Sequence, residues 1–308
     1  MPVKNIFIAG FEKCGTTALS DWMLINGLVE DRVPGVKEPF LYANDQPDAM
    51  KTRTSALPLL DASVGYAGDP AAVQRLPEDE TRIVLCLRNQ FERLWSSYKM
   101  KKVVGIEGHL IGDYFSQVNA ARSSQPEAVK SAAVVGIYQA ATCKYFPRRS
   151  HHIVERYVAE EIARLSAQSF LERVEYELGF YLSRRQLPFM SILTQSFYYY
   201  PLRTLLEKFQ PSDIAVVSVS KLENTDLRQR FVESVFEMPV VTSEVPISFS
   251  GEKIEIDEAK PDFSHSSFDL LRSVFRYDLE QARPLIKTTL FGDSLLDNKE
   301  LDRYGIKP

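Results

Sequence analysis

The chain has 308 residues, a hydrophobic fraction of 44%, a charged fraction of 25% and a formal net charge of -4. This length can bury the core of one large α/β domain, and the mild negative charge argues against a nucleic-acid-binding protein, which normally carries a basic stripe. The sequence contains no apolar run near the ~20 residues that span a bilayer, and it opens without the layout of a signal peptide.

The cysteine residues indicate a reducing compartment rather than a disulfide framework. They are odd in number and widely spaced, at Cys14, Cys86 and Cys143, and two of them fall in a predicted loop and a predicted buried strand. Neither the cysteines nor the histidines show the spacing of a metal site. We therefore expect a cytoplasmic protein that requires no metal.

Three apolar, β-branched stretches predict buried parallel strands, at residues 5–10, 82–88 and 213–219. Apolar residues at helical spacing follow the first two stretches and precede the third. Because strands alternate with helices, we predict an α/β fold with an open, mostly parallel sheet and helices on both faces.

The segment between about residues 105 and 195 contains no predicted strand. Amphipathic patterns predict long helices over residues 131–146 and 156–182, and a further helix over residues 266–286. We therefore expect a single domain over residues 1–308, with a mainly helical insertion at about 105–195.

The segment "IFIAGFEKCGTTALSDW" carries the first candidate site. Its spacing Gly10-x4-Gly15-Thr16-Thr17 is that of a phosphate-binding loop, although Thr16 stands where a nucleotide triphosphatase has lysine and the loop's own lysine is Lys13. A helix that opens directly after a buried strand presents unpaired backbone N–H groups and the positive end of its dipole to an anion. The alternative is a plain strand-to-helix turn capped by threonine.

Two motifs resemble those of the sulfotransferases that use 3′-phosphoadenosine 5′-phosphosulfate (PAPS). "FEKCGTTAL" resembles the 5′-phosphosulfate loop, whose hallmark is a lysine two residues before a Gly-Thr-Thr or similar triplet. "LCLRNQFERLWSSY" resembles the second motif, a strand-end arginine followed eight residues later by a serine on the next helix. The resemblance implies a three-layer P-loop-like fold, with Arg88 and Ser96 holding the 3′-phosphate of the nucleotide.

Two further segments extend the resemblance. "GVKEPFLY" is similar to the segment that carries a catalytic glutamate in the Golgi-type and bacterial carbohydrate sulfotransferases, and Glu38 occupies that place; the alternative is a surface pair between Glu38 and Lys37. In "SFYYYPLRTLLEKF", Tyr198 would support the site or the packing around it. By this resemblance the catalytic residues are Glu38 and Lys13, and the nucleotide-binding residues are Lys13, Cys14, Gly15, Thr16, Thr17, Ala18, Arg88 and Ser96.

The activity implied by the resemblance is in-line transfer of a sulfuryl group from PAPS to an acceptor hydroxyl, with adenosine 3′,5′-bisphosphate as the other product. Lys13 would stabilise the departing nucleotide, and Glu38 would remove the acceptor proton. The acceptor would be a saccharide or another small molecule. The sequence does not indicate an oligomeric state.

The sequence also departs from the pattern of the resembled family. Gln90 replaces the proline of the second motif, and "DASVGY" (61–66) lacks the lysine and proline that are usual there. Asp61 or Ser63 could still line the acceptor side. For the late loop that closes the 3′-phosphate pocket, Lys253 is the candidate.

Three other functions stay open. A P-loop kinase-like phosphotransferase would need lysine at position 16 and a metal-holding acid at the end of a second strand, where arginine stands. A phosphatase with Cys14 as its nucleophile would need arginine at position 20, which is serine. A non-catalytic nucleotide-binding protein of the same fold would retain the loop without turnover.

Overall fold

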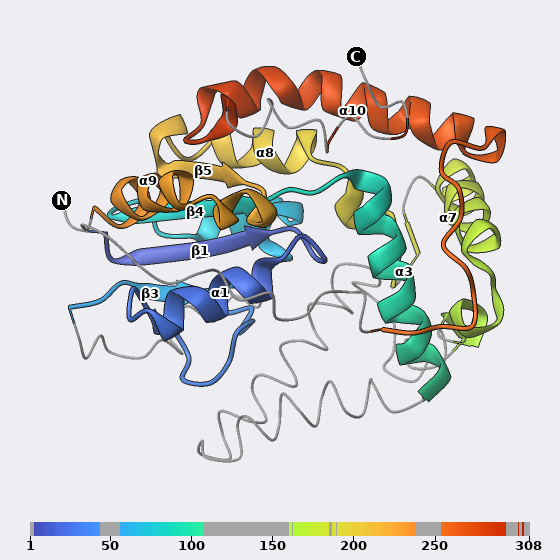
Figure 1. Ribbon diagram of the computed structural model, residues 1–308, viewed down its shortest axis with the longest axis horizontal. Coiled ribbons are helices and arrows are strands. Elements are labelled where there is room, and N and C mark those ends of the chain that lie inside the picture. Colours follow the sequence, from blue (N-terminus) through green and yellow to red (C-terminus); the bar gives the residue numbers. More distant parts are fainter. Residues whose placement is uncertain are drawn as a thin grey trace. The chain divides into compact units, whose positions relative to one another are not determined.

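The computed structural model of the chain (Figure 1) describes residues 3–43, 56–107, 160–161, 163–184, 187–188, 190–237, 254–293, 301 and 304. The chain divides into two compact units. The first unit comprises Met1–Arg93, Gln195–Ser250 and Asp262–Pro308, and the second comprises Leu94–Thr194 and Gly251–Pro261.

The first unit contains a five-stranded, all-parallel sheet with the strand order β2-β3-β1-β4-β5. The strands are β1 (Asn5–Gly10), β2 (Glu30–Asp31), β3 (Leu59–Asp61), β4 (Thr81–Cys86) and β5 (Ile214–Val217). Nearly every residue of β1, β4 and β5 is buried, as in strands that are covered on both faces. These strands confirm the three sequence predictions and the α/β class. β2 and β3 were not predicted, because two or three residues are too few to show a strand pattern.

The register brings the carboxyl ends of three strands to one edge of the sheet. Phe7 of β1 lies opposite Asp61 of β3, and Gly10 of β1 lies opposite Leu85 of β4. The segments that follow β1, β3 and β4 therefore leave the sheet next to one another. Open parallel sheets bind ligands at this edge.

Two groups of helices pack around the sheet of the first unit. In one group, α8 (Tyr199–Leu206) contacts α10 (Asp269–Thr288), α2 (Pro70–Arg75) and the 3-10 helix η2 (Tyr66–Gly68). In the other, α1 (Thr16–Ile25) and α9 (Thr225–Phe236) contact the 3-10 helix η5 (Val219–Glu223). The helix predicted over residues 266–286 is confirmed as η7 (Ser266–Phe268) followed by α10. No helix in the described part of the chain is both long and apolar enough to cross a membrane.

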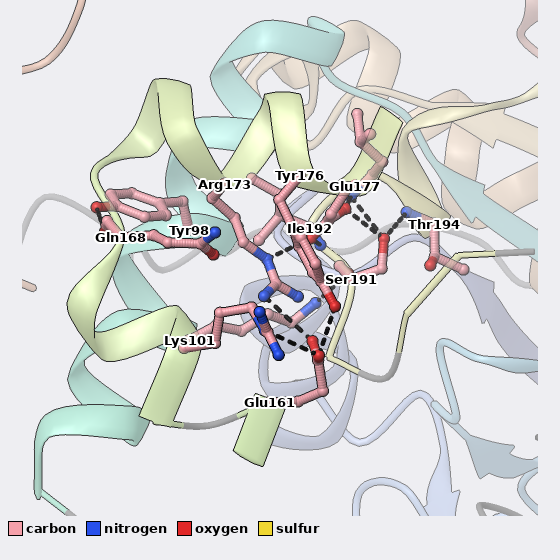
Figure 2. A network of polar contacts seen from close by, with 12 residues as sticks. Tyr98, Lys101, Glu161, Gln168, Arg173, Tyr176, Glu177, Ser191, Ile192 and Thr194 are labelled. Atoms are coloured by element: carbon pink, nitrogen blue, oxygen red, sulfur yellow. Dashed lines mark hydrogen bonds and ion pairs between the residues drawn. The ribbon is translucent and has the colours of Figure 1, made fainter. Parts of the chain in front are cut away.

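The second unit contains most of α3 (Gln90–Glu107), together with α7 (Phe170–Arg184). Figure 2 shows a buried ion-pair network that joins α7 to Glu161, in which Arg173 Nε lies 2.7 Å from Glu177 Oε1 and Arg173 Nη1 lies 3.3 Å from Glu161 Oε2. Glu177 also accepts hydrogen bonds from the Ser191 hydroxyl and the Ile192 backbone N–H. A buried charge that loses its partner costs about 3–5 kcal/mol, so this network holds the segment around residue 191 against α7.

Part of the predicted helical insertion can be compared with the structure. α7 (Phe170–Arg184) coincides with most of the C-terminal half of the helix predicted over residues 156–182. The helix predicted over residues 131–146 lies outside the described residues. The single domain with an insertion at about 105–195 stays a prediction.

Gln90 has a structural role that the proline of the resembled motif could not fill. Its fully buried Nε2 donates to the Ser196 carbonyl oxygen (2.7 Å) and to Asp278 Oδ2 (2.9 Å). Asp278 also accepts the backbone N–H groups of Tyr198 (2.8 Å) and Tyr199 (3.1 Å) at the start of α8. Because proline has no side-chain donor, only the glutamine can tie the start of α3 to α8 and α10 in this way.

We predict that Gln90→Ala lowers the free energy of unfolding by about 2–3 kcal/mol, because the buried Asp278 carboxylate and the Ser196 carbonyl each lose a hydrogen-bond donor. Urea unfolding followed by circular dichroism measures the change. The control is Gln74→Ala on an exposed side of α2, which should change the free energy by no more than about 0.5 kcal/mol. Equal stabilities of the two variants would contradict the role given to Gln90.

Candidate functional site

The loop after β1 turns at two residues with positive φ. Lys13 has a φ of 65° and Gly15 a φ of 87°, and Gly15 is the N-cap of α1. A Cβ atom at residue 15 would lie only 2.9 Å from Cβ and Cγ2 of Val219, the first residue of η5. Only glycine therefore combines this left-handed backbone with so close an approach to η5.

The N-terminus of α1 offers backbone donors to an anion. The first N–H groups of a helix have no acceptor within the helix, and in α1 no side chain caps them and no acidic residue lies in the first turn. The residues of this turn are the predicted phosphate-binding residues Thr16, Thr17 and Ala18. Their N–H groups and the positive end of the helix dipole together favour a bound phosphate or sulfate group.

Arg88 lies against the same loop. It follows β4 by two residues, and its Nη1 is 3.4 Å from the carbonyl oxygen of Lys13, which is 75 residues away in the sequence. Its Nη2 lies 3.9 Å from Glu92 Oε2, and 34% of its side chain is exposed. A guanidinium group has five N–H donors, so these contacts leave Arg88 able to bind a phosphate group.

A second arginine and a glutamine hold the backbone of the loop at Glu12. Neither was assigned a role from the sequence. Arg93 is fully buried, and it donates through Nη1 to the Glu12 carbonyl oxygen (3.4 Å) and through Nε to Ser196 Oγ (2.9 Å). The Glu12 N–H donates to Gln195 Oε1 at 2.5 Å. Arg93 could be recognised as part of the second motif. Gln195 could not be recognised, because it is distant from the loop in the sequence and only the fold brings the two together.

Tyr198 supports the loop through packing and through one hydrogen bond. Its ring lies 4.9 Å from the Phe11 ring, between centroids, and its hydroxyl donates to the Arg88 carbonyl oxygen at 2.6 Å. The hydroxyl also hydrogen-bonds to the Cys14 side chain. Tyr198 thus links the loop to the segment that carries Arg88.

Cys14 is part of the loop, and its thiol is buried. Its side chain is only 3% exposed. Burial raises the pKa of its thiol to about 11, although the positive charges of Arg93 and Arg88 oppose this shift. The thiolate is the reactive form of cysteine, so a thiol that stays protonated at neutral pH argues against the phosphatase alternative.

Glu38 reaches the loop through Lys37. Lys37 Nζ lies 2.7 Å from Glu38 Oε1 and 3.4 Å from Thr16 Oγ1. About a quarter of each of these two side chains is exposed, 26% for Lys37 and 25% for Glu38. The ion pair between Glu38 and Lys37, which was the alternative to a catalytic role for Glu38, is therefore present. Its lysine lies next to Thr16, the first residue of α1. No role in the site was predicted for Lys37 from the sequence.

Ser96 belongs to the second unit, where it lies on α3. Its side chain is 4% exposed, and its Oγ has no hydrogen-bond partner among the described residues. A buried hydroxyl without a partner is unfavourable, and a ligand oxygen could satisfy it. The assignment of Ser96 to the 3′-phosphate stays a prediction.

The described residues give no support for a direct ligand contact at three other predicted positions. Asp61 or Ser63 could have lined the acceptor side, but both are 0% exposed and make internal hydrogen bonds. Lys253, the candidate for the late loop, lies outside the described residues. Within the described ranges, no group of three or more His, Cys, Asp or Glu residues is placed to hold a metal ion.

The site of the first unit therefore combines an uncapped helix start, the cationic side chains of Arg88 and Lys37, and the Glu38 carboxylate. Such a set can bind a phosphate or sulfate ester and can accept a proton next to it. No protein-family model matches the chain, and no curated protein matches it significantly. The function of the site is therefore inferred from its geometry and from the resemblance of its motifs.

Proposed function

We propose that the chain is a sulfotransferase that moves a sulfuryl group from PAPS to an acceptor hydroxyl, on a three-layer P-loop-like fold. The proposal is supported mainly by one observation: the loop after β1, the segment that carries Arg88 and the segment that carries Lys37 and Glu38 lie together at the start of α1. Arg88 lies 3.4 Å from the Lys13 carbonyl oxygen, and Lys37, which pairs with Glu38, lies 3.4 Å from Thr16 Oγ1. A sulfated nucleotide carries several negative charges, so clustered cations and N–H groups would bind it.

Each group has a role in binding the donor. The N–H groups of Thr16, Thr17 and Ala18 bind the 5′-phosphosulfate, as helix N-termini bind other phosphate esters. The Arg88 guanidinium binds the 3′-phosphate through two parallel N–H donors. Gly15 supplies the left-handed turn and leaves room for Val219, which keeps the first N–H groups of α1 in place for the donor.

The transfer needs alignment and charge stabilisation more than covalent help. Glu38 removes the proton of the acceptor hydroxyl while the acceptor oxygen forms a bond to sulfur. The bond between sulfur and the bridging oxygen of the 5′-phosphate breaks, and the Lys13 ammonium group stabilises the negative charge that develops on that oxygen. Lys37 Nζ lies 2.7 Å from Glu38 Oε1 and 3.4 Å from Thr16 Oγ1, so Lys37 links the Glu38 carboxylate to the first residue of α1.

The kinase-like alternative has less support. Its lysine would stand at position 16, which is a threonine, and its metal-binding acid would follow β4, where the chain has Arg88. The acceptor class, a saccharide or another small molecule, follows from the resemblance of the "GVKEPFLY" segment to carbohydrate sulfotransferases. The other alternative is a protein that binds the nucleotide without catalysing transfer. The following experiments distinguish it from a sulfotransferase.

We predict that Lys13→Ala lowers kcat by ~10²–10³, because one group that stabilises developing charge is lost. The rate is the release of adenosine 3′,5′-bisphosphate from PAPS, with acceptors drawn from a library of saccharides and small hydroxyl compounds and sulfated products identified by mass spectrometry. The control is Lys4→Ala, whose side chain is 47% exposed and pairs with Glu80; it should keep the rate of the wild type. An unchanged rate in Lys13→Ala would contradict the role of Lys13.

We also predict that Glu38→Gln reduces turnover by ~10²–10⁴, because the amide cannot take the acceptor proton. Binding of adenosine 3′,5′-bisphosphate, measured by calorimetry, should stay close to that of the wild type. The matched control is Glu207→Gln, since Glu207 is 55% exposed and forms a surface pair with Arg203. If Glu38→Gln turns over like the wild type, Glu38 is not the base.

A further inference from the structure

A buried polar cluster contacts the segment that carries Glu38. It consists of Asp61, the last residue of β3, and of Ser63 and Tyr66, which follow it. All three side chains are 0% exposed. A buried carboxyl group is rare and unfavourable unless hydrogen bonds compensate for the lost water, so the contacts of Asp61 indicate what the cluster does.

Asp61 accepts hydrogen bonds from both of the other residues of the cluster. The Tyr66 hydroxyl donates to Asp61 Oδ2 at 2.9 Å, and the Ser63 backbone N–H donates to Asp61 Oδ1 at 3.1 Å. Burial raises the pKa of Asp61 to about 6, while the hydrogen bond from the Ser63 side chain and the charge of Arg32 oppose the shift. A hydroxyl has one proton and two lone pairs. The Tyr66 hydroxyl therefore directs its proton at Asp61, and both the Tyr66 and the Ser63 hydroxyl keep lone pairs as acceptors.

These acceptors bind the backbone of the segment that carries Glu38. The Phe40 N–H donates to Ser63 Oγ at 2.9 Å, and the Tyr42 N–H donates to the Tyr66 hydroxyl at 3.3 Å. On the near side of Glu38, the Lys37 carbonyl oxygen accepts the Ala62 N–H at 3.0 Å. The segment from Lys37 to Tyr42 is thus held on both sides of Glu38.

The segment needs such support because it has little of its own. Residues 37–42 form neither helix nor strand, so no regular ladder of hydrogen bonds holds their backbone. Phe40 has a φ of 50°, and a left-handed backbone is unfavourable for a residue with a side chain. Apolar residues could fill the same volume as Asp61, Ser63 and Tyr66, but they could not accept the two N–H groups.

We infer that Asp61, Ser63 and Tyr66 are positioning residues for the reaction, which fix the backbone of residues 37–42 so that Glu38 stays paired with Lys37, the residue that reaches Thr16. The inference rests on the proposed function, because it takes Glu38 as the base. The register of the sheet supports it, since Asp61 lies opposite Phe7 on β1, the strand that leads into the loop. The loop and the cluster therefore leave neighbouring strands at the same edge.

Two substitutions remove one hydroxyl each. Ser63→Ala removes the acceptor of the Phe40 N–H, and Tyr66→Phe removes both the donor to Asp61 and the acceptor of the Tyr42 N–H. Their controls are Ser212→Ala and Tyr277→Phe, at exposed positions of the first unit. If one variant fails to fold, the other still decides the outcome.

The first measurement does not depend on activity. Amide hydrogen exchange at Phe40 in Ser63→Ala, and at Tyr42 in Tyr66→Phe, should become about tenfold faster or more, because each amide loses its acceptor. The control variants should exchange like the wild type at both amides. Unchanged exchange in Ser63→Ala and Tyr66→Phe would overturn the inference, whatever the chain catalyses.

The second measurement distinguishes positioning from general stability. Ser63→Ala should lower kcat ~10–100-fold through misplacement of the base, with an unchanged affinity for adenosine 3′,5′-bisphosphate. In a Glu38→Gln background the same substitution should cause no further loss, because it acts through Glu38. An equal loss in both backgrounds would overturn the inference.

A wild type that neither binds the nucleotide nor transfers sulfuryl groups would refute the proposed function, while the exchange result would still decide whether the cluster fixes the segment.

Discussion

The left-handed turn at Gly15 is the constraint on which the rest of the site depends. Gly15 has a φ of 87°, and any Cβ there would meet Val219 at 2.9 Å. The left-handed turn sets where α1 begins, because Gly15 is its N-cap, and therefore where its first N–H groups point. Since β1 lies between β3 and β4 in the parallel sheet, the segments that follow these two strands leave the sheet at the same edge as the loop.

The side chains around this turn are held by polar contacts from distant parts of the first unit. Arg93 and Gln195 bind the two backbone groups of Glu12, and Tyr198 binds the carbonyl oxygen of Arg88. The buried cluster at the end of β3 does the same for the segment of Glu38. A site of this kind is pre-organised before a ligand binds, so little free energy is lost in arranging it.

The sequence predicted the parts of this site that depend on local pattern. Long apolar strands and the spacing of the loop around Gly15 could be recognised directly, and so could the motif that begins at Arg88. β2 and β3 were missed because they have two and three residues. The roles of Gln90 and Gln195 were missed because their partners are about 100 residues away or more, at Ser196 and Glu12. From the sequence, Asp61 or Ser63 could have lined the acceptor side, and only the fold shows that both are buried.

The most direct test of this account is a calorimetric titration of the wild-type chain with adenosine 3′,5′-bisphosphate in the presence of a metal chelator. The account predicts one site with a Kd on the order of micromolar, near -8 kcal/mol, and no binding of adenosine, which lacks both phosphate groups. An absence of binding at millimolar nucleotide would contradict the claim that the start of α1 holds a phosphorylated donor.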